Sequence, residues 1–77
     1  MTGESKKEKR IRSYQRYRRV ADRTGKSDYQ VSKEAGFHNV IFSDWKYGRC
    51  EPKVDKLLAI SKVLNVSIDE LIEEKEG

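Results

Sequence analysis

The chain has 77 residues, which is enough for one small domain. Charged residues make up 39% of it, and no apolar run approaches the roughly 20 residues that cross a bilayer. One cysteine and one histidine offer no disulfide, no spaced metal ligands and no nucleophile–base pair, so we expect neither an enzyme nor a metal or cofactor site. No apolar signal segment opens the chain, which predicts a cytoplasmic protein.

The formal charge of +4 is unevenly spread along the chain. Residues 1–26 carry ten Lys or Arg against three Asp or Glu, whereas residues 27–77 carry seven against ten. A basic end favours a polyanionic partner, and a well-solvated helix face is the alternative.

The apolar periodicity predicts an all-α domain of five short helices. Gly25, Gly36 and Gly48 each follow a helical stretch, as glycines at helix C-termini do. The helices are expected from Lys6 to Thr24, from after Ser27 to Gly36, from His38 or Asn39 to before Gly48, after Pro52, and from Ser67. Three pairs have the spacing of capping boxes: Ser5 with Glu8, Ser27 with Gln30, and Ser67 with Glu70.

The same periodicity indicates which faces are buried. In the first helix, the apolar stripe is Tyr14, Tyr17, Val20 and Ala21, and in the fourth it is Val54, Leu57, Leu58, Ser61 and Leu64. The first turns of the first helix are too charged to pack. We therefore expect residues 1–10 to form a basic, frayed arm, residues 11–74 the domain, and residues 75–77 a tail.

Residues 28–47 place two short helices next to each other with almost no connecting loop. Gly36 takes a positive φ without steric cost, and the small Ser32 allows close backbone approach. Apolar residues stand where two crossed helices share a core with a third: Val31, Ala35, Phe37, Phe42 and Trp45. Residue size and spacing predict a helix-turn-helix over about 28–47.

Downstream motifs extend this pattern: "Trp45-Lys46-x-Gly48-x-x-x-Pro52", "Lys56-Leu57-Leu58-x-Ile60" and "Asn65-Val66-Ser67-Ile68-Asp69-x-Leu71". With them the chain resembles, from about Tyr14 to Ile72, the phage repressors and Cro proteins of the xenobiotic-response-element family. The "FSDWK–G–P" combination is similar to repressors from phages and mobile elements of Gram-positive bacteria. The resemblance implies a five-helix lambda-repressor-like domain that acts as a transcriptional repressor or regulator on an operator in double-stranded DNA.

Several positions depart from the family pattern. Ser32 replaces the usual alanine, and Lys26 stands where an aliphatic residue usually precedes the second helix. Ala21 and Lys46 occupy the positions at which many members pair an arginine with a glutamate, so that ion pair is absent. We expect Tyr29 and Trp45 to supply the missing apolar area.

The third helix is expected to lie in the major groove, with Phe42 and Trp45 fixing its rotation. The residues predicted to contact bases are Asn39, Val40, Ser43 and Asp44. Asparagine bonds adenine, valine touches the thymine methyl group, and aspartate accepts from cytosine N4. The residues predicted to contact the DNA backbone are Tyr29, Gln30, His38, Lys46, Tyr47 and Arg49, with Arg16, Arg19 and Arg23 as weaker candidates. Asp28 opposes phosphate binding at the start of the second helix.

Alternatives remain for individual residues. Asn39 caps the third helix in one interpretation, and Asp44 serves only to reject wrong sequences. Ile41 faces either the core or the DNA. We favour Trp45 as a core residue over a stacking one, and His38 as a solvated or capping residue over a metal ligand. We expect Cys50 to be a free thiol.

One recognition helix reads few base pairs, so we expect a weak homodimer that is completed on DNA. Its candidate surface combines the fourth and fifth helices, with Leu64, Val66, Ile68, Leu71 and Ile72. In the alternative, these side chains cover the core of their own subunit.

The alternative function is a protein-interaction module, such as an antitoxin or antirepressor partner, which uses the same fold without reading DNA.

Overall fold

The computed structural model describes residues 5–72, with side chains up to residue 71. Within this range the protein is all-helical, without a strand, and the predicted number of five helices is confirmed. They are α1 (Lys6–Thr24), α2 (Asp28–Ala35), α3 (Val40–Lys46), α4 (Val54–Leu64) and α5 (Asp69–Ile72). None of the described helices is long and apolar enough to span a membrane.

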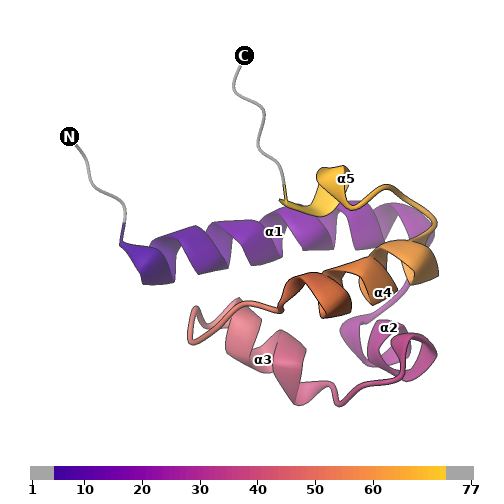
Figure 1. The fold of residues 1–77 in the computed structure, drawn as a ribbon, viewed down its shortest axis with the longest axis horizontal. Helices are drawn as coiled ribbons and strands as arrows, with labels where there is room; N and C mark the ends of the chain where they lie inside the picture. Colours follow the sequence, from indigo (N-terminus) through magenta and orange to yellow (C-terminus); the bar gives the residue numbers. More distant parts are fainter. Residues whose placement is uncertain (1–4, 73–77) are drawn as a thin grey trace.

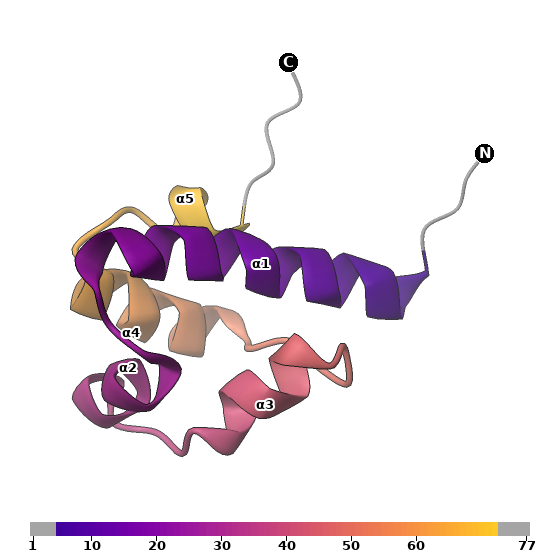
Figure 2. The same cartoon turned by 180° about the vertical axis from the view of Figure 1, so that it is seen from behind.

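α1 runs along the length of the molecule, and the other helices lie on two sides of it (Figure 1). Its 19 residues span about 28 Å of the 40 Å long axis. α5 packs against one side of α1, while α3 and α4 pack against the other, and α2 packs against α4. The reverse view shows the same order, with α2 and α3 farthest from α5 (Figure 2). This arrangement leaves α2 and α3 open on the side that faces away from α1.

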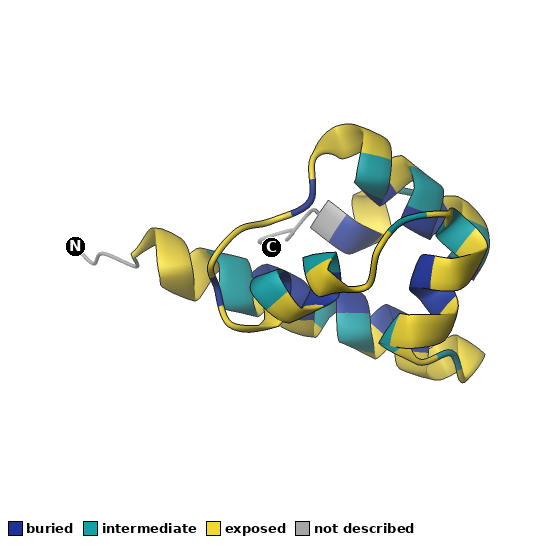
Figure 3. Ribbon diagram, turned by 90° about the horizontal axis from the view of Figure 1, so that it is seen from below, coloured by how far each residue is buried: buried dark blue, intermediate teal, exposed yellow. Residues whose placement is uncertain are grey.

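The core lies where α1, α3 and α4 meet. The predicted stripe of α1 is confirmed, because all four of its residues are buried. The buried apolar residues are Tyr14, Tyr17, Val20, Ala21, Val31, Phe42, Trp45, Leu57, Ile60, Leu64 and Leu71. In Figure 3 the buried positions lie on the helix faces that turn toward the centre of the molecule. An aromatic cluster thus ties α1 to α3, and aliphatic residues join the remaining helices to it.

The start of α1 and that of α2 follow their local sequences to different degrees. Ser5 and Glu8 form the predicted capping box in both directions. Ser27 caps α2 through its hydroxyl, which accepts from the Gln30 backbone N–H at 3.1 Å. The Gln30 side chain donates to Glu34 instead of returning to Ser27. Only half of the predicted second box is therefore present.

The end of α4 and the start of α5 depend on backbone geometry. Asn65 ends α4 with φ 60° and ψ 45°, a left-handed conformation that asparagine tolerates better than most residues. α5 begins at Asp69, and the Ser67 carbonyl accepts from the Glu70 N–H at 3.1 Å. The pair predicted to form a third capping box is joined through the backbone.

The buried face of α4 differs from the predicted one. Three of the predicted positions are buried: Leu57, Ser61 and Leu64. The prediction is wrong for Val54 and Leu58, which are 63% and 43% exposed, while Ile60 is fully buried in their place. α4 contacts both α1 and α2, and Ile60 is on the face that joins the core. Val54 and Leu58, one turn apart, are left on the solvent side.

The candidate dimer surface is largely used within the monomer. Leu64 and Leu71 are buried, and Val66 and Ile68 pack half-buried against the core. The alternative in which these side chains cover their own subunit therefore holds for Leu64 and Leu71. The side chain of Ile72 lies outside the described residues.

The first turns of α1 cover part of the predicted arm. Residues 6–10 are helical and begin at the capping box, and the Arg10 guanidinium donates to the Gly48 carbonyl at 3.3 Å. The predicted fraying and the boundaries at residues 10 and 74 remain predictions. Residues 1–4 and the predicted tail 75–77 lie outside the described range.

Candidate nucleic-acid interface

Phe42 and Trp45 set the rotation of α3 by packing into the core. The ring of Tyr17, from α1, stacks on both, with its centroid 5.0 Å from that of Phe42 and 5.1 Å from that of Trp45. Such pairs contribute about 0.5–1.5 kcal/mol each beyond the burial of their area. The interpretation of Trp45 as a core residue is confirmed by its complete burial. The opposite face of α3 is consequently turned outward.

Four side chains form the outward stripe of α3, at the spacing i, i+3, i+4 and i+7: Val40, Ser43, Asp44 and Tyr47. Val40 is 49% exposed and Tyr47 is 53% exposed. Ser43 is also exposed, and Asp44 is half-buried. The structure thus gathers three of the four predicted base contacts, and one predicted backbone contact, on a single helix face.

A hollow of about 220 Å³ lies between this face and the start of α2. The residues that line it are Asp28, Asn39, Phe42, Ser43, Lys46 and Tyr47. Four of them are predicted DNA contacts, and they bring an amide, a hydroxyl, an ammonium group and a phenol together. This set both donates and accepts hydrogen bonds, as the edges of base pairs and the phosphates require.

The two residues before α3 divide the capping role. The His38 Nδ1 accepts from the Val40 backbone N–H at 3.2 Å, so the capping interpretation holds for His38. The Asn39 carbonyl accepts from the Phe42 N–H at 3.0 Å, but its side chain makes no capping hydrogen bond. The Asn39 side chain is exposed at the N-terminus of α3 and does not cap the helix.

Asp44 and Arg49, predicted to contact a base and a phosphate respectively, are bonded to each other. The Arg49 Nε donates to the Asp44 carboxylate at 2.9 Å, and the guanidinium lies 5.3 Å from the centre of the Tyr47 ring. An exposed pair of this kind stabilises a fold by only about 0.2–1 kcal/mol. Its larger consequence is that each charge partly cancels the other on the outward face of α3.

The Asp28 carboxylate, which is expected to oppose phosphate binding at the start of α2, is bonded to three side chains of α1. It accepts from the hydroxyls of Tyr14 and Tyr17 at 2.6 and 2.7 Å, and from Arg18 at 2.6 Å. Burial, together with the hydrogen bond to Asp28, raises the pKa of both tyrosines well above their ordinary value. The negative charge is thereby compensated by donors from α1.

Sequence reasoning missed this contact, although a signal for it exists. Tyr14, Tyr17 and Arg18 stand at i, i+3 and i+4, which places three donors on one stripe of α1. A stripe of buried donors requires an acceptor, and Asp28 is the first carboxylate of the neighbouring helix. The Arg18–Asp28 pair joins α1 to α2.

The start of α2 presents the two remaining predicted backbone contacts. Tyr29 is 60% exposed, and the Lys33 ammonium lies 5.5 Å from its ring centre. The expectation that Tyr29 adds apolar area to the core is therefore wrong. The Gln30 amide donates to Glu34 at 3.1 Å, and Lys26 donates to the same carboxylate at 2.9 Å. These bonds lower the pKa of Glu34.

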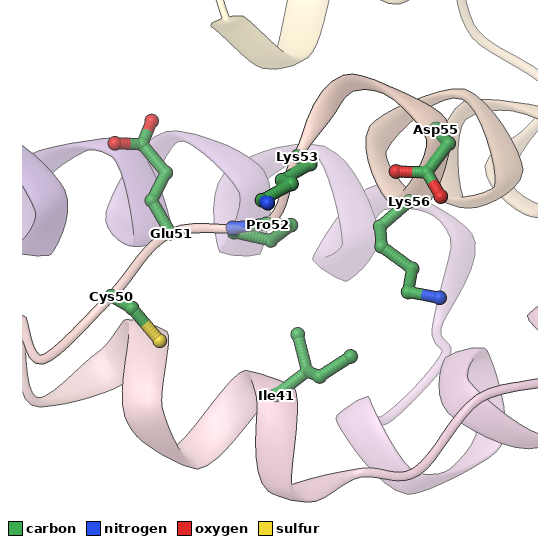
Figure 4. A pocket seen from close by; sticks show the side chains of 7 residues that line it. All are labelled: Ile41, Cys50, Glu51, Pro52, Lys53, Asp55 and Lys56. Carbon is green, nitrogen blue, oxygen red and sulfur yellow. The ribbon is translucent and has the colours of Figure 1, made fainter.

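Ile41 faces neither the core nor the outward stripe. It points from α3 toward the segment that leads to α4, where it lines a pocket of about 250 Å³ with Cys50 and Pro52 (Figure 4). Cys50 is an exposed free thiol. Both alternatives considered for Ile41 are thus replaced by a third position between two segments.

No protein-family model, curated protein or solved structure matches this chain. The resemblance to phage repressors therefore rests on the residues of the chain itself.

Proposed function

We propose that this protein is a sequence-specific double-stranded DNA-binding regulator of transcription. In this proposal α2 and α3 act as a helix-turn-helix, and α3 enters the major groove. The observation that carries the proposal is the division of α3 into two faces. Phe42 and Trp45 lock one face to α1, and the other presents exposed residues with an open hollow beside it.

The chemistry of the outward face suits base edges. The Asn39 amide makes no capping hydrogen bond to α3, and adenine N6 and N7 take an amide in a bidentate geometry. Val40 is an exposed β-branched side chain at the start of α3, and the thymine methyl group is an apolar partner of matching size. Ser43 donates or accepts. The Asp44 carboxylate accepts a hydrogen bond from cytosine N4, either after its bond with Arg49 breaks or with that bond still in place.

The test is selection of bound sequences from a random duplex library, followed by titration of the selected duplex. Asn39→Ala/Val40→Ala is expected to lower affinity about 10-fold or more for the selected site, and little for other duplexes. The matched control is Gln15→Ala/Val54→Ala, which removes the same two groups from exposed positions of α1 and α4. An unchanged sequence preference in the first variant would contradict the assignment of α3 to the groove.

The proposal includes two subunits for each operator, because one short helix reads too few base pairs to select a single site. A titration of defined duplex, followed by mass measurement, should show a 2:1 complex on an inverted repeat with half-sites about 34 Å apart. A 1:1 complex of full affinity on a site without symmetry would refute the dimer and leave the fold unchanged.

A protein-interaction module is the second candidate function. The exposed apolar pair Val54 and Leu58 on α4 favours it, since large apolar side chains one turn apart offer a surface to another protein. Under this alternative the chain binds no duplex even at low salt. The library selection separates the two candidates, because it returns no enriched sequence in that case.

A further inference from the structure

The positive charge of the chain is concentrated away from the helix pair assigned to base reading. Residues 27–49, which contain α2 and α3, carry three Lys or Arg and three Asp or Glu. α1 alone carries nine Lys or Arg against two acidic residues. Because phosphate neutralisation supplies the sequence-independent part of DNA affinity, a neutral helix pair gives little of it. Most of the cations available to phosphates therefore lie outside this helix pair, and α1 carries the largest group of them.

The first two turns of α1 lie directly against Gly48, the residue that follows α3 and its C-cap. A Cβ placed on Gly48 would come within 2.6 Å of the Lys7 Cγ and within 2.9 Å of the Lys7 carbonyl oxygen. The Arg10 Nη1 donates to the Gly48 carbonyl at 3.3 Å. Figures 1 and 2 show the first turns of α1 beside the segment that follows α3. Lys7 and Arg10 are thereby held at the end of α3.

Two further cations flank the same glycine from the other element. Lys46 ends α3, and Arg49 follows Gly48, with both side chains exposed and their charged groups within 6 Å of the Tyr47 ring. We name Lys7, Arg10, Lys46 and Arg49 the Gly48 cluster. Asp44, paired with Arg49, borders the cluster, and Glu51 stands two residues after Arg49 in the chain. Four cations thus meet two carboxylates.

We propose that Lys7 and Arg10 are phosphate-binding residues, which complete with Lys46 and Arg49 a site for one strand of the duplex backbone beside the groove that α3 enters. The proposal rests on the proposed function. The ligand is the phosphodiester backbone of double-stranded DNA, and charge complementarity selects it. Arginine offers five N–H donors, of which Gly48 uses one, so the Arg10 guanidinium can still donate to a phosphate. The capping box of Ser5 and Glu8 orders the first turn of α1, which contains Lys7 and directly precedes Arg10.

The test measures duplex affinity as a function of salt for the whole chain and two variants. Lys7→Gln/Arg10→Gln removes two cluster charges but keeps long polar side chains, and Arg10→Gln retains a donor for the Gly48 carbonyl. The control, Lys53→Gln/Lys62→Gln, removes two exposed charges from the N-cap and last turn of α4. Fluorescence anisotropy of a labelled duplex gives the slope of log affinity against log salt.

The cluster variant is expected to reduce the magnitude of that slope by about 1.8, since each neutralised phosphate contributes about 0.9. Between 50 and 200 mM salt the unaltered protein then loses about 12-fold more affinity than the variant. The control should keep the original slope. An unchanged slope in the cluster variant, or an equal reduction in the control, would overturn the site while the proposed function stands. Absence of binding by the unaltered protein at low salt would instead remove both.

Discussion

Gly48→Ala is the substitution for which the structure gives the sharpest expectation. The residue has φ 77° and follows α3 and its C-cap, where the first two turns of α1 lie against it. A methyl group at this position would lie 2.9 Å from the Lys7 carbonyl oxygen and 3.0 Å from the Ile11 Cγ1. Since the carbonyl belongs to the backbone, either α1 or the segment after α3 has to move.

Gly36 separates the two contributions to this cost, because it has a φ of 87° with open space around it. The left-handed conformation costs an alanine about 1–2 kcal/mol at either position. Overpacking adds about 1–3 kcal/mol at Gly48 alone. Gly36→Ala should therefore lower the free energy of unfolding by about 1–2 kcal/mol, and Gly48→Ala by about 2–5 kcal/mol. The total for a chain of this length is about 4–12 kcal/mol.

Urea denaturation followed by far-ultraviolet circular dichroism measures both variants, with Trp45 fluorescence as an independent probe of the core. Adding Lys7→Ala to Gly48→Ala is expected to restore little stability. It removes the Cγ contact but leaves the carbonyl oxygen in place. Equal free energies of unfolding for Gly36→Ala and Gly48→Ala would refute the packing of α1 on Gly48.

Three further outcomes are expected. Trp45→Ala should lower the free energy of unfolding by about 3–5 kcal/mol, the usual cost of deleting a large buried aromatic side chain. Trp45→Phe should lower it less, because the indole Nε1 has no hydrogen-bond partner among the described residues. An unaltered melting temperature for the alanine variant would show that the side chain is not buried. Asp44→Asn removes a negative charge from the outward stripe and frees Arg49. Affinity should therefore rise several-fold for unselected duplexes but not at the selected site, where the contact with cytosine is lost. A fall on all sequences alike would contradict this. Raising the pH above 10 should destabilise the fold by up to about 1.4 kcal/mol per pH unit for each of the two tyrosines bonded to Asp28. The pKa values of Tyr14 and Tyr17 are raised in the fold, so their hydroxyls lose protons at lower pH in the unfolded chain than in the folded one. Urea titrations at several alkaline pH values measure that slope, which Tyr17→Phe should halve.

The helices could be predicted from the sequence because local signals determine them. The stripe of α1, the capping box at Ser5 and the left-handed Gly36 all depend on residues within a turn or two of each other. The burial of Phe42 and Trp45 also followed from the sequence, since a short helix with two large aromatic side chains three residues apart has one plausible inner face.

What the sequence did not indicate depends on contacts between distant residues. The apolar residues of α4 are spread too widely around the helix to show that Ile60, rather than Leu58, is buried. Asp28 looked like an obstacle to phosphate because its donors lie 10 to 14 residues away in another helix. The pairing of Asp44 with Arg49 likewise requires the turn after α3, which no periodicity predicts.

The proposed phosphate contacts of Lys7 and Arg10 come from α1, whereas the proposed base contacts come from α3. The binding free energy is therefore expected to divide into a sequence-independent part and a sequence-specific part. Phosphate contacts act on all sequences alike, whereas each base contact discriminates by about 1–3 kcal/mol. Because residues 27–49 are neutral, losing the Lys7 and Arg10 charges should weaken specific and non-specific binding equally and preserve their ratio. Losing Asn39 should reduce that ratio. If the ratio changes when the two α1 charges are removed, the phosphate site and α3 are coupled, and Gly48, where the two elements touch, is the position through which that coupling acts.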